Sequence, residues 1–175
     1  PGPVADIVVD WERDCAPARE AGARVVTVRT GVVLSGAGGM LPALAAVTRS
    51  GLGGRLGSGE QWMSWIALDD LTDIYLRAIV DPTVDGTVNG TAPAPVTNAK
   101  FTRGLGTVLR RPTLVPVPGW APAIILGSRG ADELALADQR VVPAALTGLG
   151  HRFRHPDLAS ALAHELGAEE VPAAL

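Results

Sequence analysis

The sequence predicts an α/β fold with a parallel sheet, because a helical pattern near its start runs directly into a strand pattern. Apolar residues recur every three or four positions from Val4 to Ala21, which indicates one face of a helix, and Gly22 is expected to end it. Residues 24–30 are rich in β-branched side chains and continue into a second apolar run at 31–34. A helix followed by a mostly apolar strand is the second half of a strand–helix–strand unit, so the sheet is expected to be parallel. The strand before that helix does not occur in the sequence, so the chain is expected to open within such a unit.

The rest of the chain predicts alternating helices and strands joined by glycine-rich loops. After a loop at 35–39, the expected elements are a helix at 40–49, a glycine-rich loop at 51–59, a strand at 62–68, a helix ending at Val80, a strand at 87–91, a helix at 98–109 and an extended segment at 114–117. Asp69 and Asp70 are expected to cap the helix that ends at Val80, with Leu71, Ile74, Tyr75, Ala78 and Ile79 facing inward. From Trp120 onward the pattern is helical but interrupted, with a small strand at 151–153 and a last helix at 156–166.

Composition excludes several classes of protein. The 175 residues are 47% hydrophobic, which is ample for a buried core. With 15 Lys and Arg against 18 Asp and Glu, the net charge of −3 argues against binding to nucleic acid or to an anionic membrane surface. Cys15 is the single cysteine, so neither a disulfide framework nor a cysteine-based metal site is expected. The sequence has no membrane-length apolar run and no secretory signal pattern, so a cytoplasmic setting is expected.

The glycine-rich loop at 51–59 does not predict a dinucleotide fingerprint. That fingerprint must follow a strand and open a helix, so that the helix N-terminus faces the pyrophosphate. Here the loop follows a helix and precedes a strand, and Leu56 stands where the third glycine belongs. The segment 36–39 does lie between a strand and a helix but lacks the full fingerprint, so a loop that lines a substrate site is expected there.

The three histidines, His151, His155 and His164, do not predict a metal site. Two ligands four residues apart share a face only on a helix, and 151–155 spans an expected strand. No carboxylate or cysteine is expected close by to complete a site, so these histidines are expected to lie at the surface or to be satisfied locally, and no metal is expected.

Trp62 and Trp65 have two interpretations. Two tryptophans three residues apart and beside glycines can form the aromatic wall of a small-molecule cleft. In a chain that is 4% aromatic, they can equally fill the core. The residues alone do not decide between these two roles.

An ordered series of motifs resembles one family of proteins. The motifs are Asp10-Trp11-Glu12, the run from Arg29 to Ser35, Gly38-Gly39-Met40-Leu41, the glycine-rich loop at 51–59, the run from Trp65 to Asp70, the run from Asn89 to Asn98, Arg111-Pro112, the run from Gln139 to Pro143, and His151-Arg152-Phe153-Arg154. The series covers residues 10–167 and is similar to the second half of extended short-chain dehydrogenases of the "epimerase family" type. These proteins are related to nucleotide-sugar epimerases and dehydratases.

The resemblance implies a doubly wound, Rossmann-type parallel sheet with a small, mostly helical lobe on the substrate side. It implies that residues 1–117 form the C-terminal half of an NAD- or NADP-binding domain and that 118–175 form the small C-terminal domain of this family. The function implied is the substrate-side half of an NAD(P)-dependent oxidoreductase or epimerase-like protein with a small-molecule substrate, and a homodimer is compatible with it. The alternative is a dehydrogenase-fold protein that binds a nucleotide or metabolite without turnover.

The catalytic Tyr-x-x-x-Lys pair of such enzymes does not occur in this chain. In that pair the Tyr hydroxyl is the acid or base, and the Lys one helical turn later lowers its pKa. The single tyrosine, Tyr75, has Ile79 four residues later, and the single lysine, Lys100, has Val96 four residues before it. No catalytic residue is therefore assigned from the sequence.

The resemblance does imply binding residues. Thr30, Gly31 and Val32 follow the strand at which extended members contact the nicotinamide end of the cofactor. The residues expected to line the substrate cleft are Gly39, Met40, Arg55, Gln61, Trp62 and Trp65. Arg29 is expected to be either a cleft cation for an anionic substrate or a structural ion-pair partner, because a charged residue at a buried strand end is seldom left unpaired.

Overall fold

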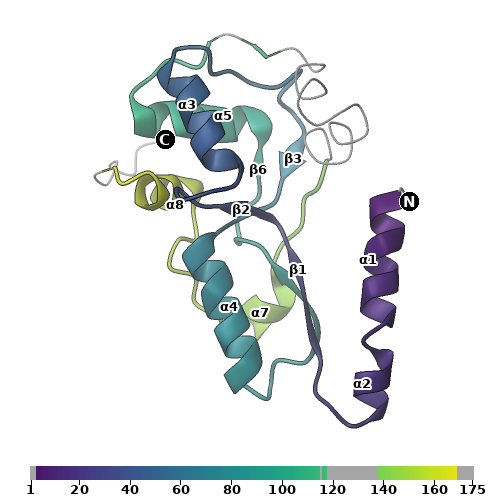
Figure 1. Cartoon of the computed structure of the whole chain (residues 1–175). Helices are drawn as coiled ribbons and strands as arrows, with labels where there is room; N and C mark the ends of the chain where they lie inside the picture. Colours follow the sequence, from purple (N-terminus) through teal and green to yellow (C-terminus); the bar gives the residue numbers. More distant parts are fainter. Residues whose placement is uncertain (1–2, 115, 118–137, 169–175) are drawn as a thin grey trace.

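Helices and strands alternate along the chain in the computed structural model, which describes residues 3–114, 116–117 and 138–168 (Figure 1). The helices are α1 (Pro3–Arg13), α2 (Ala16–Glu20), α3 (Met40–Arg49), α4 (Leu68–Val80), α5 (Asn98–Leu109), α7 (Ala144–Gly148) and α8 (Leu158–Glu165). The strands are β1 (Val26–Thr30), β2 (Val32–Leu34), β3 (Trp62–Met63), β4 (Trp65–Ala67), β5 (Gly86–Gly90) and β6 (Val96–Thr97). In these ranges, no helix is both long enough and apolar enough to cross a membrane. The helical pattern expected from Trp120 to residue 137 lies outside the described residues.

The sheet is parallel where the sequence predicts it to be. β1 pairs with β5 and β2 pairs with β4, both in parallel, while β3 pairs with β6 in the antiparallel sense. β1 and β2 are separated by Gly31 alone, whose N–H donates to the carbonyl of Gly90 at 3.1 Å. The N–H of Val32 then donates to the carbonyl of Ser64 at 2.8 Å. The chain therefore changes its pairing partner at Gly31, and the α/β class is confirmed.

Two apolar clusters hold the helices on this sheet. The first joins α3, α5 and α8 to β2, β4 and β6, and its buried members are Leu34, Leu41, Trp65, Ala67, Ala92, Val96, Phe101, Leu105, Val108, Leu158, Ala161 and Leu162. The second joins α4 and α7 to β4 and β5, and its buried members are Ile66, Leu71, Ile74, Ala78, Val84, Val88 and Leu146. Because β4 contributes to both clusters, it ties the two halves of the core together.

The first expected helix is broken into two. α1 ends at Arg13 and α2 begins at Ala16, with Pro17 in its first turn, where a missing N–H is tolerated. The apolar face of α1 is largely exposed: Ile7 is 49% exposed and Trp11 is 69% exposed. The reason is that a groove, rather than packed side chains, separates α1 from β1.

Three further expectations are wrong in detail. The strand expected at 62–68 is interrupted at Ser64 and ends at Ala67, because Leu68 begins α4. On α4, Tyr75 and Ile79 are 48% and 73% exposed, so the buried stripe is narrower than the periodicity predicts. Residues 151–153 form no strand, although Phe153 packs against the second cluster.

Asp70 does not cap α4, although that role is expected from its position. The N-cap residue is Ala67, and the side chain of Asp70 is fully buried. Its two carboxylate oxygens accept hydrogen bonds from the backbone N–H groups of Arg154 at 2.6 Å and His155 at 3.0 Å. Asp70 therefore anchors the segment before α8 to the first turn of α4.

Candidate functional site

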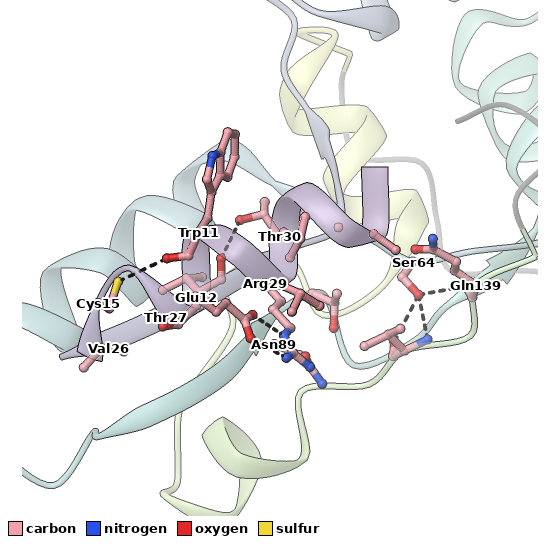
Figure 2. Close-up of a pocket in the computed structure, with 17 residues that line it drawn as sticks. Trp11, Glu12, Cys15, Val26, Thr27, Arg29, Thr30, Ser64, Asn89 and Gln139 are labelled. Atoms are coloured by element: carbon pink, nitrogen blue, oxygen red, sulfur yellow. Dashed lines mark hydrogen bonds and ion pairs between the residues drawn. The ribbon is translucent and has the colours of Figure 1, made fainter. Parts of the chain in front are cut away.

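A groove lies between α1 and β1 and reaches past the carboxyl end of β1 (Figure 2). Its volume is about 1040 Å³. The α1 wall includes Val8, Trp11 and Glu12, and the facing wall includes Arg29, Thr30 and Gly31. Thr91, which follows the carboxyl end of β5, also lines the groove, as do Ser64, which directly precedes β4, and Gln139. In open α/β sheets, ligands bind at the carboxyl ends of the strands. We call this space the α1–β1 groove.

Arg29 bridges the two walls of the α1–β1 groove. Its Nε and Nη2 atoms donate to the two carboxylate oxygens of Glu12, each at 2.7 Å, in a bidentate ion pair. These hydrogen bonds lower the pKa of Glu12 and raise that of Arg29, so both groups are charged at neutral pH. Of the two roles expected for Arg29, the ion pair is present, and the side chain lines the groove as well.

Gly31 brings two backbone segments together at the end of the groove. A Cβ atom at this position would lie 2.8 Å from the carbonyl oxygen of Ser64 and 3.0 Å from Cγ2 of Thr91, so no side chain fits without movement.

Thr91 is 1% exposed, and its hydroxyl has no hydrogen-bond partner among the residues that the structure describes. A buried hydroxyl without a partner costs about 1–3 kcal/mol. The environment of Thr91 is therefore one that a bound polar group would complete.

Ser64 holds a distant segment against the same end of the groove. Its hydroxyl accepts from the N–H of Val141 at 2.7 Å and lies 2.9 Å from the carbonyl oxygen of Gln139, to which it can donate. Nearby, Nδ2 of Asn89 donates to the carbonyl of Val142 at 3.2 Å. Sequence reasoning did not find these contacts, because they join residues more than 50 positions apart.

The predicted binding residues divide into two groups. Arg29, Thr30 and Gly31 line the α1–β1 groove, whereas Val32 packs against the first core cluster. None of the six residues expected in the substrate cleft, Gly39, Met40, Arg55, Gln61, Trp62 and Trp65, lines that groove.

Those six residues lie in several different settings. Gly39 precedes α3 with a φ of 70°, and Met40 begins that helix with 40% exposure. Arg55 and Gln61 donate to backbone carbonyls within their own loop. The ring of Trp62 lies 4.4 Å below the guanidinium of Arg140.

Trp65 occupies the core, which is one of its two expected roles. It is fully buried in the first cluster, and its indole N–H donates to the carbonyl of Ala94 at 3.0 Å. A fully buried ring of this kind has no surface to offer a ligand. The expectation that Trp65 lines the substrate cleft is therefore not what the structure shows.

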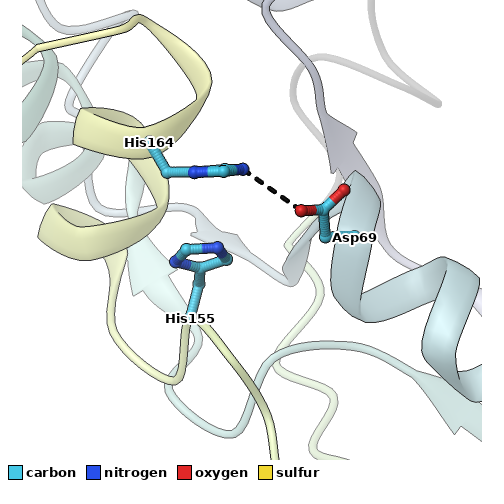
Figure 3. A group of neighbouring side chains, drawn as sticks. All are labelled: Asp69, His155 and His164. Carbon is cyan, nitrogen blue, oxygen red and sulfur yellow. Dashed lines mark ion pairs between the residues drawn. The ribbon is translucent and has the colours of Figure 1, made fainter.

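Two histidines lie beside a carboxylate, against expectation (Figure 3). Nε2 of His164, on α8, lies 3.2 Å from a carboxylate oxygen of Asp69, on α4. The rings of His155 and His164 are stacked with their centroids 4.4 Å apart. The expectation that no carboxylate stands near these histidines is wrong, because the fold brings Asp69 to them from more than 80 residues away.

His151, the third histidine, is expected to make the folded protein less stable in mild acid. Burial lowers the pKa of His151 below 6.5, and the charge of Arg77 acts in the same direction against Asp70 and Asp73. The folded protein therefore binds fewer protons here than the unfolded chain, so its stability is full above about pH 6.5 and falls as the pH drops through that value. Urea midpoints at about pH 7.5 and about pH 5.5 should differ less in the His151→Gln variant than in the unsubstituted protein. An equal difference in both proteins would show that His151 does not contribute to the loss of stability in acid.

Comparison with known proteins establishes the family. Residues 117–165 match a family model described as a domain of unknown function, DUF1731. Over 163 residues the chain is 47% identical to an epimerase family protein of Mycobacterium bovis, an alignment that covers 93% of this chain and 54% of that protein. The chain belongs to the epimerase family. It spans about half the length of the curated epimerase family proteins that it matches.

Two crystal structures of similar proteins agree with this member of the epimerase family in fold. One is a nucleoside-diphosphate sugar epimerase from Corynebacterium glutamicum, with 47% identity and a TM-score of 0.79 over 99% of this chain and 33% of that chain. The other is the human epimerase family protein SDR39U1 with NADPH, with 36% identity and a TM-score of 0.78 over 83% of this chain and 49% of that chain. The parallel strand pairs of this epimerase family chain are therefore part of a Rossmann-type sheet.

Proposed function

We propose that this chain supplies the substrate-side half of an NAD(P)-dependent, epimerase-like oxidoreductase that acts on a small molecule. The observation that carries the proposal is the α1–β1 groove, which opens at the carboxyl ends of parallel strands in a Rossmann-type sheet. Thr30 and Gly31, which the family resemblance assigns to the nicotinamide end of the cofactor, line this groove. The human relative with 36% identity binds NADPH in its crystal structure, which supports a nicotinamide cofactor here.

The residues at this end of the groove fit a nicotinamide group. Gly31 lines the groove between β1 and β2, and the hydroxyl of Thr91 supplies a polar atom that the described residues leave unpaired. Thr30 is exposed at the end of β1 and borders the same space. We infer that Thr30, Gly31 and Thr91 hold the nicotinamide end and orient it. When bound, the cofactor supplies hydride transfer.

A second candidate function is binding of a nucleotide or metabolite without turnover. The residues that line the groove support this function. The single tyrosine and the single lysine lie on different helices: Tyr75 lies on α4 and Lys100 lies on α5. Neither residue lines the groove. Glu12 is held as a carboxylate by Arg29, which suits binding better than proton donation. The groove residues described here therefore bind and position, and an acid or base has to come from outside them.

Two further proposals follow from the family resemblance. The boundary between the cofactor-binding domain and the small C-terminal domain falls at residues 117 and 118. The exposed members of the expected cleft set, Gly39, Met40 and Arg55 with partly buried Gln61 and Trp62, contact the small-molecule substrate.

The proposed function is tested by titrating NADPH and NADH into the full-length protein that contains this chain. Binding is followed by the change in reduced-nicotinamide fluorescence. We expect saturable binding of one of the two dinucleotides, and lack of binding by both would overturn the cofactor assignment. Hydride transfer to or from added nucleotide sugars would favour the enzyme, whereas tight binding without oxidation or reduction of the dinucleotide would favour the binding protein.

A further inference from the structure

Asp69, His155 and His164 form a cluster, the His–Asp cluster, that has the donor set of a metal site (Figure 3). Each residue offers one ligand atom, and all three atoms lie within 4.8 Å of one another. The cluster lies outside the α1–β1 groove and plays no part in the proposed cofactor site. It therefore stands as a separate site in the fold.

The three side chains come from three separate segments, and a hydrogen bond outside the cluster joins two of these segments. Asp69 stands in the first turn of α4 and His164 in the last turn of α8. His155 lies before α8, where its backbone N–H donates to buried Asp70 at 3.0 Å. Because this hydrogen bond does not involve the ligand atoms, the fold itself holds the His155 segment beside α4.

The separations of the three ligand atoms can be compared with those around a tetrahedrally coordinated ion. Metal–nitrogen and metal–oxygen bonds of about 2.0–2.2 Å place ligand atoms about 3.3–3.6 Å apart around a tetrahedral centre. The contact between Asp69 and His164 is already 3.2 Å, and the third atom lies within 4.8 Å. The His155 ring is stacked on the His164 ring with an interplanar angle of 25°, so it has to turn out of this stack for its nitrogen to complete the set.

Chemistry selects the class of ion. Two imidazole nitrogens and one carboxylate oxygen suit borderline divalent transition metals such as Zn²⁺, whereas Ca²⁺ and Mg²⁺ prefer sites made of oxygen. The side chains of His164 and Asp69 are 47% and 44% exposed, so an ion reaches them from solvent and a coordination position stays open to water. We infer that the His–Asp cluster binds one divalent transition-metal ion and joins α4 to α8 through it.

The test is metal titration of the untagged, metal-free full-length protein. Co²⁺ is the first probe, because its visible absorption reports tetrahedral coordination, and Zn²⁺ binding is then measured by calorimetry. We expect one site per chain and a rise in melting temperature with Zn²⁺, because ligands that bind only the folded state stabilise it. His164→Ala and Asp69→Asn should each weaken Zn²⁺ binding by at least about tenfold, since even outer-shell changes often cost that much.

The matched control is His151→Gln, which removes a histidine that lies outside the cluster. This variant should keep the affinity of the unsubstituted protein. Absence of Co²⁺ absorption and of Zn²⁺ heat in the unsubstituted protein would overturn the site. Equal Zn²⁺ affinity in the unsubstituted protein and in His164→Ala would place any bound ion elsewhere and would also overturn it.

Discussion

Trp65→Ala is expected to lower the free energy of unfolding by about 4 kcal/mol, within the range of about 3–5 kcal/mol for removing a buried aromatic ring. The ring is fully buried in the first core cluster, and its N–H is bonded to the carbonyl of Ala94 at 3.0 Å. Truncation therefore opens a cavity between β4 and the helices and leaves that carbonyl without its donor. Urea unfolding of the full-length protein, followed by circular dichroism, measures the change.

Trp62→Ala is the matched control for this measurement. Trp62 is partly buried and packs beneath Arg140 at the edge of β3, so its loss should cost clearly less stability than the loss of Trp65. The reverse order, with Trp65→Ala weakening ligand binding while leaving the urea midpoint unchanged, would return Trp65 to the cleft and contradict the core assignment.

Asp70→Ala is expected to cost about 3 kcal/mol, because a hydrogen bond to a charged group contributes about 1.5–3 kcal/mol and two are lost. The substitution leaves the N–H groups of Arg154 and His155 without their acceptor at a partly buried position. We expect the segment 151–166 to detach from α4 before the rest of the fold opens. Hydrogen exchange at the amides of residues 154 and 155 would report this as faster exchange.

Asp73→Ala is the control for Asp70→Ala. Asp73 is bound to the guanidinium of Arg154 at 2.6 and 2.7 Å, but this ion pair is partly exposed, and such pairs contribute only about 0–1 kcal/mol. A larger loss of stability in Asp73→Ala than in Asp70→Ala would show that the exposed ion pair, and not the buried carboxylate, holds the C-terminal segment.

The sequence predicted those features that depend on local patterns. The strand at 24–30 was predicted from its β-branched content, and the helix predicted at 98–109 agrees with α5, whose N-cap Thr97 accepts from the N–H of Lys100. The parallel sheet followed from the order of helix and strand. The break between α1 and α2 was missed, because apolar spacing continues across the break and hides it.

Features that depend on long-range packing were not predictable in this way. An aspartate in the first turn of a helix has the same sequence signature whether it caps that helix or accepts from a distant backbone, so Asp70 was misassigned. The meeting of Asp69 with His164 depends on where α8 docks, which no local spacing encodes. For Trp65, burial was decided by helices α3, α5 and α8 closing over β4.

Blocking the carboxyl end of β1 tests most directly whether the nicotinamide end of the cofactor lies there, as we propose. Thr30 is exposed and borders the α1–β1 groove, so Thr30→Trp fills the space without disturbing a core contact. Thr87→Trp is the matched control, because Thr87 is exposed near the amino end of neighbouring β5 and does not line the groove.

The measurement is the dissociation constant of NADPH for the full-length protein and both variants. We expect the affinity to fall at least about tenfold, or about 1.4 kcal/mol, for Thr30→Trp alone. Equal affinity in all three proteins would contradict it.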